Sequence, residues 1–287
     1  MKEHPLYLAV GHVSQDIIPG GWKVGGTVSF ALRVADVLGC ETRLITSAAA
    51  NFPLLAALPS TILHVIPAPE TTIFENVQTP RGRVQTLHGR ALPLEPTHLP
   101  PQWPLPDIVH LSPIAAEVSP AWVDYFRATS PNAVGQTPLI GLTPQGWLRT
   151  WDEQGHVTAS AWNAAAKILP LAHVTILSQE DWPDEATMAL FQRCAPLLVV
   201  TEGANGCQVY INGEAHHVPV DPVTEVETTG AGDVFAAAFL ICLYHTGDPL
   251  ASAHAANQIA AQSVTQTHLA AKIEAVKKLE FKARARG

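Results

Sequence analysis

Short runs of apolar residues alternate with longer segments of helical periodicity along most of the chain. Apolar runs of four or five residues are typical of buried strands, and longer periodic segments are typical of helices. We expect strands at 6–10, 42–46, 108–111, 138–142, 173–177, 196–200, 207–211 and 214–218. We expect helices at 28–38, 119–126, 161–169, 185–194 and 232–246, with another from Asp248-Pro249. Strands that alternate with helices favour a parallel sheet.

Residues at the ends of these segments support the assignment. Gly39 and Gly247 each follow a predicted helix, where glycine is a common terminator. Ser119 and Pro120 suit the N-cap and the first residue of another helix. Asn212-Gly213 separates the last two predicted strands, and this dipeptide is the strongest short signal for a β-hairpin. The boundaries are therefore marked by residues as well as by periodicity.

Two segments depart from this alternation, 12–24 and 71–94. The second alternates apolar with polar residues around a turn at Arg81-Gly82. We expect the two segments to form a small antiparallel sheet beside the main body. A proline-rich connector, 93–106, then returns the chain to the α/β pattern. Without an internal repeat, we expect residues 1–287 to form one domain with these segments inserted in it.

Composition narrows the classes of function. The chain has 287 residues, of which 47% are hydrophobic and 15% are charged, with a net charge of −8. This composition excludes intrinsic disorder, and the acidic balance disfavours nucleic acid as a partner. The longest apolar run, 234–243, is too short to cross a membrane.

The cysteines and the N-terminus indicate the compartment. Four widely spaced cysteines form no C-x-x-C pair, which predicts reduced core thiols rather than a disulfide framework or a metal site. The apolar run at 6–10 is too short for the core of a signal peptide. We therefore expect a cytoplasmic protein.

The segment Glu227-Thr-Thr-Gly-Ala-Gly-Asp-Val-Phe235 carries the clearest chemical signal. Glycines at the start of a helix allow a tight backbone, and the first helical turn presents unpaired N–H groups at a positive dipole end. Such a site binds anions without needing a lysine. Asp233 stands beside it, where a carboxylate could deprotonate a hydroxyl that attacks a phosphoryl group.

Three other interpretations compete with this one. A dinucleotide fingerprint would require a small residue where Phe235 stands. A phosphate loop of the G-x-x-x-x-G-K-[ST] type is not formed by the glycine-rich segment 20–27, which lacks the lysine at the required place. An ordinary helix N-cap is the third interpretation, and the flanking Thr-Thr, phenylalanine and alanine-rich helix weigh against it.

The run Thr228-Thr-Gly-Ala-Gly-Asp-Val-Phe235 resembles the C-terminal signature of the ribokinase-like, or PfkB-type, carbohydrate kinases. Further motifs follow the same order along the chain. Gly11 with Asp16, then Gly25-Gly26, resemble the sugar site of that family, and 200–206 resembles its T-x-G-x-x-G turn on the nucleotide side. The segment 253–256 resembles the helix that borders the adenine pocket, so the likeness extends from residue 6 to about 265.

The resemblance implies an α/β fold with three layers, α/β/α, around a mostly parallel central sheet. It also implies a small β-sheet lid over the acceptor, and the segments 12–24 and 71–94 fall where that lid would be. Members of the family often dimerise through the lid, so a homodimer is one expectation.

The resemblance also implies roles for individual residues. Asp233 would be the general base, with ATP as phosphoryl donor and Mg²⁺ as its companion ion. The amides of the anion hole would come from Gly230, Ala231 and Gly232. The acceptor would be bound by Asp16, Gly25, Gly26, Gln145 and Arg149. The nucleotide would be bound by Ser178, Thr201, Gly203, Gly206, His254 and Asn257.

Some positions depart from the family pattern. Phe30 replaces the asparagine of G-G-x-x-x-N, which removes one contact to a sugar hydroxyl. Thr143-Pro-Gln145 replaces D-P-N on the acceptor side. Ser178 and Asp181 replace the ends of N-x-x-E, so Asp181 would reach a metal only indirectly, through water. These departures resemble the myo-inositol kinase-like branch of the family.

We therefore expect an ATP-dependent phosphotransferase that phosphorylates a hydroxyl of a small sugar or cyclic polyol, with a myo-inositol-like acceptor favoured. A nucleoside kinase would use the same machinery with a different pocket. A ligand-binding regulatory protein with little turnover is the alternative from another class, suggested by the altered residues Ser178 and Asp181.

Overall fold

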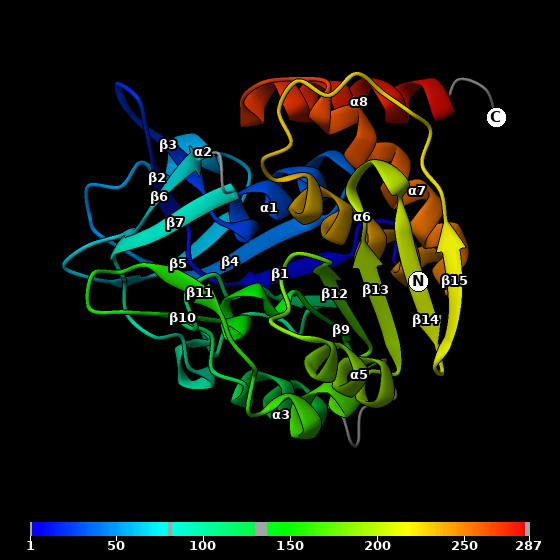
Figure 1. Cartoon of the computed structure of the whole chain (residues 1–287), viewed down its shortest axis with the longest axis horizontal. Coiled ribbons are helices and arrows are strands. Elements are labelled where there is room, and N and C mark those ends of the chain that lie inside the picture. Colours follow the sequence, from blue (N-terminus) through cyan, green and yellow to red (C-terminus); the bar gives the residue numbers. More distant parts are fainter. Residues whose placement is uncertain (1, 80–81, 130–136, 285–287) are drawn as a thin grey trace.

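The apolar runs of the sequence lie side by side in one nine-stranded sheet of the computed structural model, which describes residues 2–79, 82–129 and 137–284 (Figure 1). The strand order is β15-β14-β13-β12-β9-β8-β1-β4-β5. Strands from β13 to β5 pair in parallel, and β14 and β15 are antiparallel. The strands are β1 (Leu6–Val10), β4 (Glu41–Ala48), β5 (Ile62–Pro67), β8 (Ile108–Leu111), β9 (Leu139–Leu142), β12 (Val174–Ser178), β13 (Leu197–Thr201), β14 (Cys207–Ile211) and β15 (Glu214–Val218).

Helices cover both faces of this sheet (Figure 1). One face packs against α1 (Thr27–Val37), α6 (Ala231–Thr246), α7 (Pro249–Val264) and α8 (Leu269–Arg284). The other packs against α3 (Ala121–Ala128), α4 (Ala165–Ile168) and α5 (Glu185–Cys194). Tyr7 and Ala9 of β1 belong to the first buried cluster, whereas Leu8 and Val10 belong to the second. The predicted three-layer α/β/α core is confirmed.

The predicted end signals mostly hold. Gly39 and Gly247 have positive φ at the ends of α1 and α6, and Asn212 and Gly213 adopt positive φ in the β14–β15 turn. The Asp248 side chain accepts hydrogen bonds from the first amides of α7.

Two boundaries differ from the prediction. The helix predicted from Ser119 begins at Ala121, with Pro120 as N-cap and no side-chain cap. The helix predicted at 161–169 is α-helical only at Ala165–Ile168, because the following Leu169–Leu171 turn contains a proline and tightens to a 3₁₀ geometry.

The two irregular segments form a four-stranded lid, ordered β3-β2-β6-β7. Its strands are β2 (Ser14–Ile18), β3 (Gly21–Gly25), β6 (Thr72–Thr79) and β7 (Gly82–Gly89). The prediction of a wholly antiparallel sheet is wrong at one junction, because β2 and β6 pair in parallel. Both strands leave the main sheet in the same direction, β2 after β1 and β6 after β5. Arg81 of the predicted turn lies outside the described residues.

Some elements had no counterpart in the sequence pattern. They are β5, the short helix α2 (Leu54–Ala57) and the hairpin of β10 (Arg149–Trp151) with β11 (Val157–Ala159). The four cysteines are free; Cys40 and Cys207 are buried in the core as predicted, whereas Cys194 and Cys242 are only partly buried. In the part of the chain that the structure describes, no helix has the length and apolar character needed to cross a membrane.

A buried carboxylate, Glu117, fixes the start of the lid. Its side chain accepts hydrogen bonds from the backbone N–H groups of His12, Ile114 and Ala115, at 2.7 to 3.1 Å. Only 1% of Glu117 is exposed. His12 lies between β1 and β2, so this carboxylate ties the root of the lid to the loop after β8.

We predict that Glu117→Ala lowers the free energy of unfolding by about 3 kcal/mol, because it leaves buried N–H groups without acceptors. Urea unfolding monitored by circular dichroism measures the change. Glu153→Ala, at an exposed loop position, serves as the control and should change stability by less than about 0.5 kcal/mol. Equal effects of the two substitutions would contradict this account of Glu117.

Candidate active site

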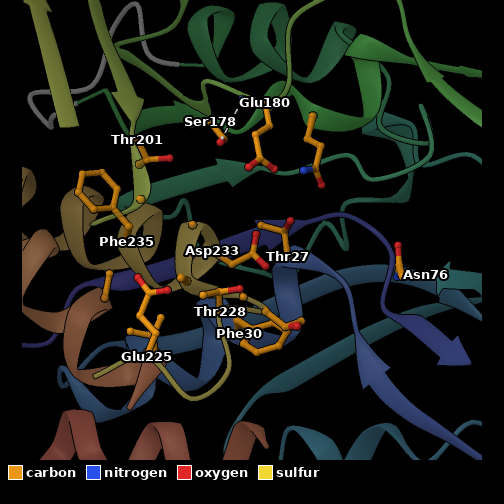
Figure 2. A pocket seen from close by; sticks show the side chains of 18 of the residues that line it. Thr27, Phe30, Asn76, Ser178, Glu180, Thr201, Glu225, Thr228, Asp233 and Phe235 are labelled. Carbon is orange, nitrogen blue, oxygen red and sulfur yellow. Dashed lines mark hydrogen bonds between the residues drawn. The ribbon is translucent and has the colours of Figure 1, made fainter. Parts of the chain in front are cut away.

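Two helices, α1 and α6, begin at the same place, beneath the lid (Figure 2). A cavity of about 860 Å³ opens there, between the lid, the ends of β12 and β13, and the loop that leads into α6. Figure 2 places Asn76 at the lid end, Glu225 and Phe235 at the opposite end, and Asp233 with Thr27 between them. Because α6 starts at Ala231 and α1 at Thr27, both helix N-termini present their positive ends to this cavity.

Asp233 stands in the first turn of α6, at the middle of the cavity. Burial raises the pKa of its carboxyl to about 6, and the nearby charges of Asp181 and Asp16 act in the same direction. A hydrogen bond from the Thr27 hydroxyl and the positive charge of Arg149 oppose this rise in pKa. A carboxylate with this pKa is ionised at neutral pH and still basic enough to accept a proton.

Gly230 forms the turn into α6. Its φ of 81° lies in the left-handed region, which favours glycine. A Cβ atom at this position would lie 2.3 Å from the ring of Phe30. In the sequence, Phe30 was notable only because it replaces the asparagine of the family motif. In the structure it packs directly against the start of α6 and also lines the cavity.

The amides predicted to form an anion hole divide into two groups. The N–H of Ala231 donates to the carbonyl of Thr228 at 3.0 Å, so it is already used within the turn. Among the described residues, no protein acceptor takes the N–H of Gly230 or Gly232, and both residues line the cavity. Two of the three predicted amides are thus available for an anion.

Asp16 and the paired glycines lie at the lid end of the cavity. Asp16 accepts a hydrogen bond from Ser14 at 2.7 Å and lines the cavity. A Cβ on Gly25 would lie 2.2 Å from the Asp16 carboxylate, so Gly25 makes room for Asp16 rather than lining the cavity itself. Gly26 has a φ of 87° and approaches the carbonyl of His12, and it does line the cavity.

Gln145 lies within a 3₁₀ turn, Pro144–Leu148, and Arg149 follows that turn; both residues line the cavity. The side chain of Gln145 donates to Asp181 at 3.0 Å, and Arg149 donates to the carbonyl of Ile114 at 3.3 Å. Arg149 is close enough to Asp233 to lower the pKa of its carboxyl. The structure therefore brings a cation beside the candidate base.

Asp181 takes part in the turn after β12. One carboxylate oxygen accepts from the N–H of Ser178 at 2.8 Å, and the other accepts from Gln145. The neighbouring Glu180, which sequence analysis did not select, points into the cavity (Figure 2). The N-x-x-E motif ends at position 181, so it did not indicate Glu180. The only sequence signal for Glu180 is that it is a carboxylate next to Asp181. The described residues contain no group of three potential metal ligands.

Most of the predicted nucleotide residues meet at the far end of the cavity. Ser178, Thr201, Gly203 and Gly206 line it at the ends of β12 and β13, and Asn257 lines it from α7. The Asn257 side chain donates to the carbonyls of Val218 and Pro219, which fixes the exit from β15.

His254 is not among the residues that line the cavity. It lies one helical turn before Asn257 on α7, beyond the edge of the cavity, and its side chain is exposed. Helix α7 borders the cavity from Asn257 onward, one turn after the predicted His254.

Two features of the cavity had no specific sequence signal. Asn76 and Gln85 stand opposite each other on β6 and β7, and Gln85 donates to Asn76 at 2.9 Å. They give the lid end a polar surface. The other end has an apolar wall, formed by Val220, Pro222, Val223, Ala260, Ala261 and Val264.

Known proteins are similar to this chain in sequence and in fold. The pfkB family of carbohydrate kinases matches residues 170–275. The chain is 24% identical to the inositol 3-kinase of Oryza sativa over 81% of its own length and 61% of that protein. It is 32% identical to the fructokinase of Escherichia coli, over 54% of this chain and 51% of that one. The matched region thus spans between half and two thirds of these relatives.

The fold is shared with solved structures. A sulfate complex of a pyrophosphate-dependent kinase of the ribokinase family superposes with a TM-score of 0.76, at 19% identity, over 94% of this chain and 99% of that one. The family match covers α6, which carries Gly230 at its N-cap and Asp233 in its first turn. Residues 170–275, which include this helix, therefore match the PfkB family of carbohydrate kinases, and the chain as a whole has the ribokinase fold.

Proposed function

We propose that the protein transfers the γ-phosphoryl group of ATP to a hydroxyl of a small sugar or cyclic polyol. The position of Asp233 carries this proposal. Its carboxylate lies midway between a polar lid pocket and a pocket with an apolar wall, beside the amides of Gly230 and Gly232. A base and an anion site adjacent to each other are what hydroxyl attack on a phosphoryl group requires.

In this mechanism, Asp233 removes the proton from the acceptor hydroxyl as the oxygen attacks phosphorus. The N–H groups of Gly230 and Gly232 hold the negative charge that develops on the transferred group. Thr27 keeps the carboxylate oriented through its hydrogen bond. Arg149 and Lys23 also line the cavity and supply positive charge from the acceptor side.

The composition of the far pocket supports a nucleoside triphosphate as donor. Val223, Ala260 and Val264 line the space beyond the anion site, and such apolar walls suit a purine base. Inorganic pyrophosphate, the donor of the structurally similar kinase, would make no use of this wall. The N–H groups of Val226 and Glu227 both donate to the carbonyl of Val264, which holds the wall together.

Magnesium fits the carboxylates present at the donor side. Mg²⁺ usually binds one or two carboxylates together with substrate phosphates and water. Glu180 lines the cavity, and Asp181 lies behind it in the same turn, where it could act through water. When bound, the ion neutralises charge on the donor phosphates.

The lid end supports a polyol as acceptor. Asp16 can accept hydrogen bonds from two adjacent hydroxyls, while Asn76, Gln85 and Gln145 provide amide groups around the same space. The likeness to the rice inositol 3-kinase favours a myo-inositol-like ring. Phe74, which also lines this end, keeps a nucleoside acceptor as the second candidate.

We predict ADP formation when the purified protein is incubated with MgATP and one member of an acceptor panel of inositols, hexoses, ribose and nucleosides. Pyrophosphate in place of ATP should give no product. Asp233→Asn should lower kcat by about 10²–10⁴-fold, the usual contribution of a positioned base. Tight ligand binding without turnover by the wild-type protein would instead favour a regulatory protein.

The substitution Asp233→Asn is also expected to leave the fold intact. Folding raises the pKa of Asp233 above its value in the unfolded chain, so the folded state favours the protonated carboxyl. The free energy of unfolding therefore falls as the pH rises through about 6 and the carboxyl ionises. At pH 8 the melting temperature of Asp233→Asn should therefore equal or exceed that of the wild type. A variant that is inactive because it is unfolded would fail this control.

A second prediction concerns pH. Since the base acts only when ionised, kcat/KM for the acceptor should decrease as the pH is lowered past about 6. Well below that pH, it should decrease about tenfold for each pH unit. Thr27→Val removes a hydrogen bond that lowers the pKa of Asp233, so the acid limb should move to higher pH. An acid limb unchanged in Thr27→Val would show that another group is titrating.

We also propose that two copies associate through the lid. Its strands carry the exposed apolar residues Ile18, Trp22, Val77 and Val84, each between 37% and 48% exposed. Val77 and Val84 are directly opposed on β6 and β7. The strand register places Trp22, Val77 and Val84 on the lid face opposite to Asp16 and Asn76, where they form an apolar surface of the kind that interfaces use.

Light scattering after gel filtration should give twice the 30.7 kDa mass of the chain. Val84→Lys should shift the protein to the monomer, because association would bury a charge at the lid surface. Ile62→Lys, at an exposed apolar position outside the lid, should not change the mass. A monomeric wild type would refute this proposal without affecting the catalytic one.

A further inference from the structure

Lys272 of α8 is among the largest fully buried side chains, with 1% of its surface exposed. A buried ammonium is costly unless it is hydrogen-bonded. Its Nζ donates to the carbonyl of Glu227 and, at 2.8 Å, to the carbonyl of Thr229. Both carbonyls belong to the loop that leads directly into the anion hole. None of the catalytic roles assigned above uses this lysine.

The surroundings of Lys272 hold it in place. The Glu227 carboxylate accepts from Lys23 at 2.6 Å and from the N–H of His268 at 3.0 Å, at the start of α8. Burial lowers the pKa of Lys272, and the charge of Glu227 opposes that shift. A small cavity of about 300 Å³, lined partly by Lys272 and Arg33, lies behind the loop.

Peptide geometry connects this lysine to the anion hole. The carbonyl of Thr229 and the N–H of Gly230 belong to one planar peptide group, and in a trans peptide they point in opposite directions. When the Lys272 ammonium holds that carbonyl, the N–H of Gly230 must point away from α8. Gly230 lines the catalytic cavity on that opposite side.

The ammonium also acts electrostatically. A positive charge next to the carbonyl oxygen polarises the peptide group, which makes the N–H at its other end a stronger donor. A glycine at position 230 gives the backbone more freedom than any other residue, so the peptide group needs an external constraint. Lys272 provides both the constraint and the polarisation.

We propose that Lys272 is a positioning residue for phosphoryl transfer, which orients and polarises the Gly230 amide from behind the active site. The proposal rests on the proposed kinase function, because the amide matters only if charge develops on a transferred group. The competing explanation is that Lys272 merely docks α8 against the body of the protein. A positioning residue would change kcat when its ammonium is removed, whereas a residue that only docks α8 would leave the kcat of the folded protein unchanged.

Lys272→Met keeps the apolar stem and removes the ammonium. We expect kcat to fall at least about tenfold, since loss of one oxyanion-hole donor costs about 10²–10³-fold, while KM for ATP and for the acceptor changes less than about twofold. Ammonium ion, which is the size of the group that Lys272→Met removes, should restore part of kcat. Lys278→Met, at an exposed position on the same helix, is the matched control and should leave kcat unchanged.

Hydrogen exchange measured by mass spectrometry provides a readout that does not need turnover. In Lys272→Met, exchange should accelerate in the peptide that contains residues 227–232 and stay unchanged in α3 and α5. This experiment tests the loop even if the wild type transfers no phosphoryl group. In that case the proposed function fails, but the exchange rates still show whether Lys272 holds residues 227–232 in place.

The remaining outcomes overturn the proposal. A folded Lys272→Met with wild-type kcat excludes a role for the side-chain ammonium, as does a loss of kcat that added ammonium ion does not relieve. If Lys272→Met does not fold, Lys272→Gln replaces it with the same expected fall in kcat, because the glutamine side chain is uncharged and ends one bond short of the Nζ position. If neither variant folds, Lys272 is a folding residue and the positioning role is rejected.

Discussion

The contact between Gly230 and Phe30 is the constraint on which the site depends. The turn before α6 rests on the Phe30 ring of α1 so closely that no Cβ could be placed between them. This contact brings the first turns of two helices together, and with them Thr27 and Asp233. A carboxylate that is half-buried between two helix N-termini experiences both desolvation, which raises its pKa, and positive dipole ends, which favour its charge. Together, desolvation and the helix dipoles leave Asp233 with a pKa of about 6, which suits a carboxylate that accepts a proton near neutral pH.

The cavity extends in two chemically different directions from this point. Toward the lid, carboxylate and amide side chains of β2, β6 and β7 offer hydrogen bonds to hydroxyl groups. Toward α7, the wall is apolar and the turn at Gly203 and Gly206 allows close approach of the backbone. Because the anion-binding amides lie between the two, a donor and an acceptor would meet at Asp233. The acidic net charge of the chain is compatible with a phosphate donor, because backbone amides at a helix N-terminus can bind an anion without lysine side chains.

Several residues support this arrangement through contacts with the backbone or with neighbouring side chains. Gly25 makes room for the Asp16 carboxylate, Asn257 holds the end of β15, and Glu117 fastens the root of the lid. Lys272 holds the loop before Gly230 from the opposite side. Three of these residues are buried polar groups that satisfy backbone atoms which loops would otherwise leave unpaired, and this is why loops can carry a fixed geometry here.

The sequence by itself determined the alternation of strands and helices, the β14–β15 hairpin and the position of Asp233 at the start of α6, because apolar periodicity and glycine placement are local properties. The lid segments were also visible in the pattern. Only the tertiary structure decided that β2 and β6 run parallel, that Glu180 rather than Asp181 lines the cavity, that Ala231 has its N–H engaged, and that His254 lies outside. Each depends on the direction of a side chain or on a pairing between distant segments, which no local pattern specifies. The burial of Lys272 is the clearest case: on α8 it is one lysine among several, and its carbonyl partners lie more than forty residues away.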